Sequence, residues 1–153
     1  MIKIILLTVV CMISAVIILY LLMIMPRMRH RPDSAPFMGV LYAHRGLHDN
    51  ASEAPENSME AFQKAVDAGF GIELDVQLSA DKIPVVFHDF SLKRACGVEG
   101  KVADYTYEEL QQFTLFDSEQ RIPQFCDVLK AVDGRVPLII EDKIPGGLTE
   151  VGP

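Results

Sequence analysis

Cysteine is scarce in this sequence, and so are basic residues once the first 38 positions are passed. The three cysteines, Cys11, Cys96 and Cys126, are odd in number and widely scattered, which excludes a disulfide framework and a cysteine-ligated zinc site. Residues 39–153 carry ten basic and twenty acidic groups. Nucleic-acid binding requires clustered Lys and Arg to neutralise phosphates, so this acidic part of the chain argues against a nucleic-acid partner.

A long uncharged run stands near the N-terminus. Residues 4–25 are 22 consecutive residues without a charge, dominated by Ile, Leu, Val and Met. As a helix this run would be about 33 Å long at about 1.5 Å per residue, which is enough to cross a bilayer. The apolar part of a cleaved signal peptide is shorter, about 7 to 15 residues. We therefore expect a transmembrane helix over 4–25, with a cleaved signal peptide as the alternative.

The segments on either side of this run suggest how it is oriented. Residues 1–3 are a short tail, and residues 26–38 form a basic juxtamembrane linker containing Arg27, Arg29 and Arg31. Because basic residues favour the cytoplasmic side, the sequence predicts a single-pass cell-membrane protein with a cytoplasmic soluble domain. The same arginines also suit contact with anionic lipid head groups, or a solvated linker.

The remainder of the chain alternates between strand and helix patterns. Two S/T/N-x-x-E patterns predict helix starts, one at Asn57 with Glu60 and one at Thr106 with Glu109. Pro123 precedes a third helical pattern. The expected strands are 39–43, 72–78, 83–87 and 136–141, and the expected third helix is 124–132.

The nearly continuous apolar runs in these strands, 136–141 among them, predict burial on both faces, and such strands separated by helices indicate an α/β fold with a parallel sheet. An open doubly wound sheet and a closed (β/α)8 TIM-type barrel both fit this pattern. Ionisable groups at the ends of successive strands favour the barrel, whose active sites lie at the carboxyl ends of its strands. A barrel needs eight strands and four are recognised, so we expect the N-terminal half of a (β/α)8 barrel, in residues 39–153, and a truncated sequence.

Three carboxylates form a candidate metal site. Glu73 and Asp75 are two residues apart in one predicted strand, so they leave the same face of the sheet. Glu141 ends another strand and offers a third oxygen donor. Carboxylates without thiols suit a hard divalent cation, Mg²⁺ or Ca²⁺. The alternative is a solvated acidic face on an edge strand.

His44 and His88 each follow or end a predicted strand. Imidazole exchanges protons near neutral pH, so this pair could act as the base and the acid on two sides of a reacting centre. Arg45 and Lys143 add positive donors suited to an anionic group such as a phosphate. A structural histidine and an ordinary surface charge are the alternatives for these two pairs.

Short motifs in the same order resemble the glycerophosphodiester phosphodiesterase family. They are His44-Arg-Gly46, Pro55-Glu-Asn57, Glu73-Leu-Asp75, His88-Asp89 and Glu141-Asp-Lys143, and they span nearly all of residues 39–143. The family fold is a (β/α) barrel with a small insertion, to which residues 90–105 would belong.

The resemblance implies that Glu73, Asp75 and Glu141 bind the divalent metal. It further implies that His44 and His88 form the acid–base pair, and that Arg45 and Lys143 contact phosphate.

The reaction implied is hydrolysis of a glycerophosphodiester to an alcohol and glycerol 3-phosphate. Two rival interpretations remain, a phosphoinositide-type phospholipase and an inactive membrane-bound fragment. The partners expected are a small-molecule glycerophosphodiester and the lipid bilayer, through residues 4–25.

Overall fold

The computed structural model describes residues 1–25 and 33–143 of the 153-residue chain. It divides into two compact units, Met1–Pro36 and Phe37–Pro153. The first unit contains helix α1 (Ile2–Ile24), which is long and apolar enough to cross a membrane. A signal sequence near the N-terminus can have the same length and composition. The expected basic patch around Arg27, Arg29 and Arg31 and the end of the chain after Lys143 lie outside the described residues.

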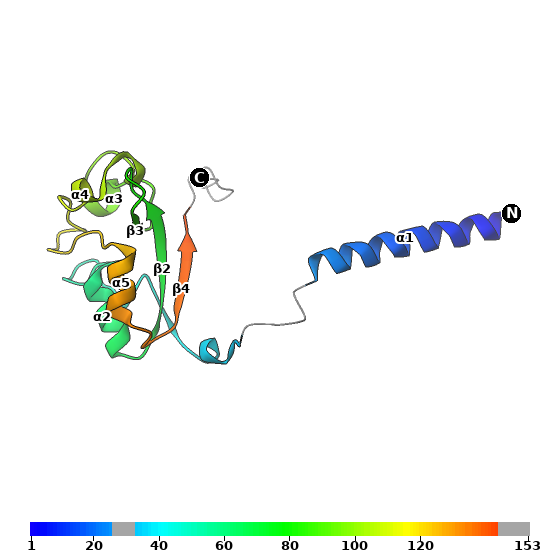
Figure 1. Ribbon diagram of the computed structural model, residues 1–153, viewed down its shortest axis with the longest axis horizontal. Coiled ribbons are helices and arrows are strands. Elements are labelled where there is room, and N and C mark those ends of the chain that lie inside the picture. The colour runs from blue at the N-terminus through cyan, green and yellow to red at the C-terminus, as the bar shows by residue number, and fades with distance from the viewer. Residues whose placement is uncertain (26–32, 144–153) are drawn as a thin grey trace. The chain divides into compact units, whose positions relative to one another are not determined.

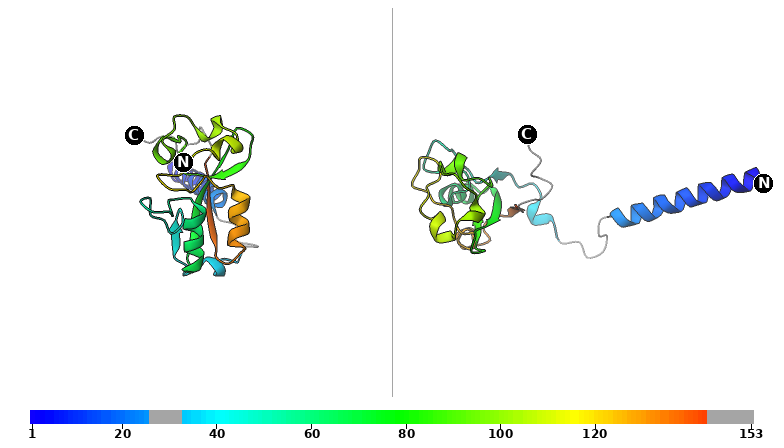
Figure 2. Two further views of the ribbon diagram at one scale, coloured as in Figure 1. Left: turned by 90° about the vertical axis from the view of Figure 1, so that its left-hand side faces the viewer. Right: turned by 90° about the horizontal axis from the view of Figure 1, so that it is seen from above.

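The second unit is built on a four-stranded sheet (Figures 1 and 2). Its central strand, β2 (Gly71–Leu78), pairs in parallel with β1 (Tyr42–His44) and with β4 (Leu138–Asp142). The short strand β3 (Pro84–Val86) pairs with the last part of β2. Strand β4 pairs with β2 over Ile72–Val76, a range that overlaps the pairings of β2 with β1 and with β3. Strands β1 and β3 therefore both lie along the edge of β2 that faces away from β4.

One prediction about the sheet was wrong. β3 runs antiparallel to β2, so three of the four strands are parallel. The connection between β2 and β3 covers only residues 79–83, and a parallel pair requires a crossover of a dozen or more residues. A connection this short leaves only a hairpin. β1 and β4 also begin later than the sequence pattern predicted, at Tyr42 and Leu138.

Two helices cover one face of the sheet, as Figures 1 and 2 show. Helix α2 (Met59–Asp67) and helix α5 (Phe125–Val132) contact each other, and both begin close to the predicted positions. Phe62 of α2 and Val128 of α5 are buried against Ile72 and Leu74 of β2. This core occupies one face of β2, so the side chains that alternate with it point to the other face.

A second core lies near the carboxyl end of β2, as Figure 1 shows by the position of α3 and α4. It is formed by Val85 of β3 and by the segment between β3 and α5, which contains α3 (Lys93–Cys96), a 3₁₀ turn (Val102–Asp104) and α4 (Tyr107–Leu110). The predicted capping box forms here, with Thr106 accepting from the Glu109 amide and Glu109 accepting from the Thr106 amide. The predicted insertion at 90–105 is therefore part of a larger folded segment.

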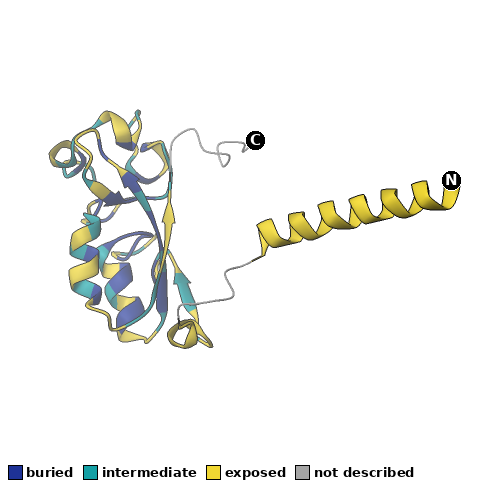
Figure 3. Ribbon diagram, turned by 45° about the vertical axis from the view of Figure 1, so that its right-hand side comes forward, coloured by how far each residue is buried: buried dark blue, intermediate teal, exposed yellow. Residues whose placement is uncertain are grey.

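Strand β4 is not buried on both faces, contrary to the pattern of its apolar residues. Ile139 and Ile140 are 46% and 48% exposed, and Figure 3 shows the strand as largely exposed. Within residues 1–25 and 33–143, β4 pairs with β2 alone and leaves its other edge free. Apolar composition therefore predicted the strand but not its position at the edge of the described sheet.

Candidate active site

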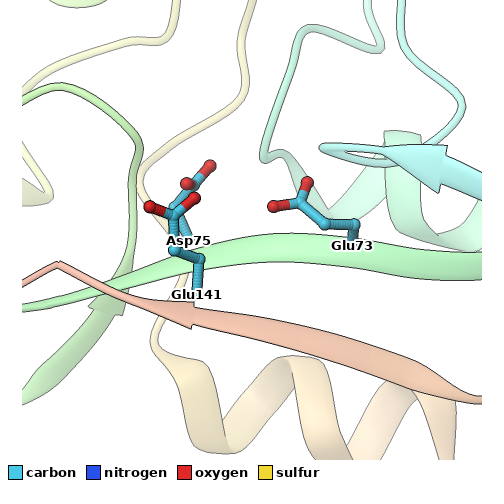
Figure 4. Close-up of side chains that lie close together, drawn as sticks. All are labelled: Glu73, Asp75 and Glu141. Atoms are coloured by element: carbon cyan, nitrogen blue, oxygen red, sulfur yellow. The ribbon is translucent and has the colours of Figure 1, made fainter. Parts of the chain in front are cut away.

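Three carboxylates leave the sheet face opposite α2 and α5. The parallel register places Asp75 of β2 beside Glu141 of β4, and Glu73 lies two residues before Asp75 on the same face. One ligand oxygen from each of the three lies within 4.8 Å of the others, and Figure 4 shows the side chains rising from the same side of the two strands. Asp75 is 1% exposed, Glu73 17% and Glu141 47%, so the cluster runs from a buried acid to an open one.

Two cationic side chains border the buried carboxylate of Asp75. The ammonium of Lys143 lies 3.3 Å from Asp75 Oδ1 and 2.7 Å from Glu141 Oε1. The Nε of Arg45 lies 3.6 Å from Asp75 Oδ2. Burial lowers the pKa of Lys143, but its hydrogen bond to Glu141 and the charge of Asp75 outweigh that effect and raise the pKa above its ordinary value. The predicted anion-binding pair therefore lies within the acid cluster.

Asp75 receives one further contact from a buried amide. Asn57 is 2% exposed and donates from Nδ2 to Asp75 Oδ2 over 3.0 Å. Its predicted role as a helix cap was wrong, because the adjacent Ser58 caps α2 by accepting from the Ala61 amide. Serine caps helices as well as asparagine does. Because Ser58 is the cap, the side-chain amide of Asn57 is free to donate to the carboxylate of Asp75, whose burial would otherwise be costly.

The donor set fits a hard divalent cation. In the described structure Asn57 Oδ1 is buried without a hydrogen-bond partner, and the buried Asp75 Oδ1 has the ion pair with Lys143, at 3.3 Å, in place of a hydrogen bond. A buried carboxylate is costly unless its charge is compensated, and a cation bound beside Asp75 would add to the compensation that Lys143 and Arg45 give. Oxygen-only ligands are those that Mg²⁺ and Ca²⁺ prefer. The three acids could therefore hold such a cation.

Residues after β1 form a tight turn that brings Arg45 to the site. Arg45 has a positive φ of 58°, and its amide donates to the Glu73 carbonyl over 2.9 Å. Gly46 follows with a φ of 83°, and a Cβ at this position would lie 2.9 Å from Ala61 of α2. Only glycine combines this backbone conformation with so close an approach to the helix.

His44 and His88 lie at different depths. His44 ends β1 with a side chain that is 67% exposed, and its Nε2 lies 3.8 Å from Glu73 Oε2. His88 follows β3 and is 31% exposed, with Nδ1 lying 2.6 Å from Asp89 Oδ1. Within the described parts of the chain, no hydrogen bond or ion pair joins the His88 side chain to the three acids.

Hydrogen bonds to its backbone instead connect the segment around His88 to β2, the strand that carries Glu73 and Asp75. The Phe87 amide donates to the Asp75 carbonyl over 2.9 Å. The buried side chain of Gln77, also on β2, directs Nε2 at the carbonyls of Phe87, His88 and Asp89, at 2.8, 3.2 and 2.8 Å. Gln77 thus fixes the backbone position from which the His88 side chain extends. Nothing in the sequence around Gln77 indicated this role.

Glu56 is a second buried acid beside the site. It accepts hydrogen bonds from Arg45, Arg94 and Asn50. Burial alone would raise the pKa of Glu56, but the hydrogen bonds from Arg94 and Asn50 and the charges of Arg94 and Arg45 outweigh it and lower the pKa from 4.5 to about 2. Neither Glu56 nor Arg94 was predicted as a site residue. The only sequence signal of Arg94 is its place shortly after the His88-Asp89 motif.

Known proteins are similar in sequence to this chain. Residues 44–148 match the glycerophosphoryl diester phosphodiesterase family. A glycerophosphodiester phosphodiesterase of Bacillus altitudinis is 49% identical over 118 residues, which are 72% of this chain and 47% of that protein. A lysophospholipase D of Homo sapiens is 38% identical over 125 residues, covering 80% of this chain and 38% of that protein.

Solved structures of phosphodiesterases are also similar to this chain. An Oleispira antarctica phosphodiesterase, solved in complex with the product sn-glycerol-3-phosphate, matches 74% of this chain and 48% of its own with a TM-score of 0.64 at 30% identity. A glycerophosphodiester phosphodiesterase of Thermotoga maritima matches 69% and 44% with a TM-score of 0.58 at 39% identity. The chain thus spans about half the length, or less, of the proteins it matches. It belongs to the glycerophosphoryl diester phosphodiesterase family.

Proposed function

We propose that residues 39–153 are the N-terminal half of a (β/α)8 barrel domain that hydrolyses glycerophosphodiesters. Water and the diester give an alcohol and glycerol 3-phosphate. The observation that carries this proposal is that carboxylate oxygens of Glu73, Asp75 and Glu141 lie within 4.8 Å of one another. The positively charged side chains of Arg45 and Lys143 border this site. The product complex of the Oleispira antarctica relative supports glycerol 3-phosphate as the product.

Each side chain has a role that follows from its chemistry. Glu73, Asp75 and Glu141 would hold a divalent cation, Mg²⁺ or Ca²⁺. Such a cation, when bound, offsets phosphate charge and lowers the pKa of an attacking oxygen.

Arg45 and Lys143 place positive charge where the phosphate group enters, and their donors stabilise the charge that develops on its oxygens. Of His44 and His88, one takes the proton from the attacking oxygen and the other donates a proton to the leaving alcohol.

The direct test is turnover by the full 153-residue chain in detergent or lipid. Glycerophosphocholine and glycerophosphoethanolamine are supplied with Mg²⁺ or Ca²⁺, and glycerol 3-phosphate is measured. We expect release with the wild-type chain and a loss of about 10²- to 10⁴-fold in His44→Ala, the usual contribution of an acid–base group. Activity confined to intact phosphoinositides would favour the phospholipase alternative, and absence of all turnover would favour a binding-only fragment.

We further propose that α1 anchors the chain to the membrane as a single pass, with residues 26–38 as the linker and the phosphodiesterase domain on the cytoplasmic side. The length and apolar composition of α1 support this. Lysophospholipids are then an accessible substrate class, in line with the name of the human relative. Alkaline extraction should leave the chain in the membrane, and protease added outside intact cells should spare the domain. Recovery in the soluble fraction would refute the anchor.

A further inference from the structure

The guanidinium of Arg94 lies between two carboxylates and engages both with paired hydrogen bonds. Its Nε and Nη2 lie 2.6 and 3.2 Å from the two carboxylate oxygens of Asp89. Its Nη1 and Nη2 lie 3.1 and 2.5 Å from the two oxygens of Glu56. A lysine ammonium lacks the planar fork needed for two bidentate pairs. Arg94 comes from α3, and Glu56 is 38 residues earlier in the chain.

One of these carboxylates determines where Arg45 lies. The Glu56 side chain is 8% exposed and also accepts from Arg45 Nη1 over 3.1 Å. Arg45 in turn lies 3.6 Å from Asp75. Arg94 therefore holds the carboxylate against which the predicted phosphate-binding arginine is placed.

The other carboxylate determines the orientation of His88. Asp89 Oδ1 lies 2.6 Å from His88 Nδ1, and an ionised carboxylate can only accept. Nδ1 therefore carries the hydrogen, and Nε2 is the nitrogen left to exchange a proton with substrate. Burial would raise the pKa of Asp89, but Arg94 and His88 outweigh it and lower that pKa, so the acceptor stays ionised at neutral pH.

We propose that Arg94 is a positioning residue that fixes His88 and Arg45 together through Asp89 and Glu56. It contacts none of the three acids of the candidate metal site in the described structure, so it acts through other residues. The ring of Phe116 lies 5.6 Å from the Arg94 guanidinium carbon and supports it from the second core. The kinetic consequence rests on the proposed phosphodiesterase function, whereas the structural consequence does not.

The structural test measures the tautomer of the His88 ring. The full chain is labelled with ¹⁵N-histidine in detergent micelles, and the His88 resonances are assigned with a His88→Gln variant. We expect wild type to show the Nδ1–H tautomer, and Arg94→Ala to lose it in favour of the Nε2–H form of free histidine. Lys93→Ala is the matched control, because it removes a neighbouring charge of α3 that pairs with Glu99 instead. It should leave the tautomer unchanged.

Arg94→Lys is a second variant, in case Arg94→Ala does not fold. It keeps a positive charge beside Glu56 but cannot serve both carboxylates, so we expect the same loss of the Nδ1–H tautomer with near-UV circular dichroism retained. An Nδ1–H tautomer that persists unchanged in a folded Arg94→Ala or Arg94→Lys protein would overturn the proposal.

The kinetic test uses glycerophosphocholine turnover. Arg94→Ala should lower kcat by about 10- to 100-fold, the loss typical of a removed orienting group, with KM changed much less. Millimolar guanidinium should restore part of that loss, and equal concentrations of ammonium should not. If guanidinium gives no rescue while wild type is active, the positioning role is refuted. If wild type shows no turnover, the proposed function fails, and the tautomer measurement alone decides on Arg94.

Discussion

Replacing Glu56 with glutamine should destabilise the second unit in a pH-dependent way. The carboxylate of Glu56 is 8% exposed and accepts from Arg45, Arg94 and Asn50. Glutamine keeps the shape of the side chain but removes its negative charge, which leaves Arg45 and Arg94 facing an uncharged amide. The lost interaction is the one that lowers the pKa of Glu56.

The size of the effect follows from that pKa. A decrease from 4.5 to about 2 corresponds to about 3 kcal/mol between the ionised and the protonated side chain, at about 1.4 kcal/mol per unit. Because the folded-state pKa is lowered, this stabilisation is fully present above pH 4.5 and is lost as the pH falls towards 2. We therefore expect Glu56→Gln to lose about 3 kcal/mol at pH 7 and only about 1 kcal/mol at pH 3.

Urea unfolding of the full chain in detergent measures this difference. The sequence has no tryptophan, so the signal is near-UV circular dichroism of tyrosine, of which Tyr105 packs edge-on to Phe113. Glu60→Gln on the exposed side of α2 is the matched control and should change stability by less than about 0.5 kcal/mol. An equal loss at pH 7 and pH 3 would refute the electrostatic reasoning, and so would no loss at pH 7.

Other substitutions test the packing and the chemistry. Leu74→Ala should cost about 2 to 5 kcal/mol in the same unfolding assay, because Leu74 is fully buried beneath α2 and α5; a cost under 1 would contradict that core. Thr106→Ala should cost about 1 kcal/mol by removing the capping box of α4, and Thr106→Ser should restore most of it. His88→Ala should lower phosphodiester turnover by about 10²- to 10⁴-fold with unfolding unchanged; unaltered turnover would exclude His88 from proton transfer.

Local patterns were enough to predict most of the elements. The central strand β2, the helices α2 and α5 and the Thr106 capping box all follow from residue spacing of a few positions. The period of two also placed Glu73 and Asp75 on the same face, opposite the buried Ile72 and Leu74. These features depend on neighbours in sequence, which a single chain displays.

Pairing between distant residues was harder to predict. Apolar composition suggested that β4 was covered on both faces, but it is the edge of the described sheet. Asn57 looked like a helix cap because of Glu60, and only the fold shows that its amide meets Asp75. Arg94 reaches Glu56 across 38 residues, a contact that no local spacing encodes.

The central claim is that Glu73, Asp75 and Glu141 together bind one divalent cation, and calorimetric titration of the purified full chain with Ca²⁺ and with Mg²⁺ tests it most directly. We expect one site per chain, and binding at least about tenfold weaker in Asp75→Asn, which removes the buried member of the cluster. Asp142→Asn is the control, because Asp142 alternates with Glu141 on β4 and points to the opposite face. No binding by the wild-type chain, or equal binding by Asp75→Asn and wild type, would contradict the claim.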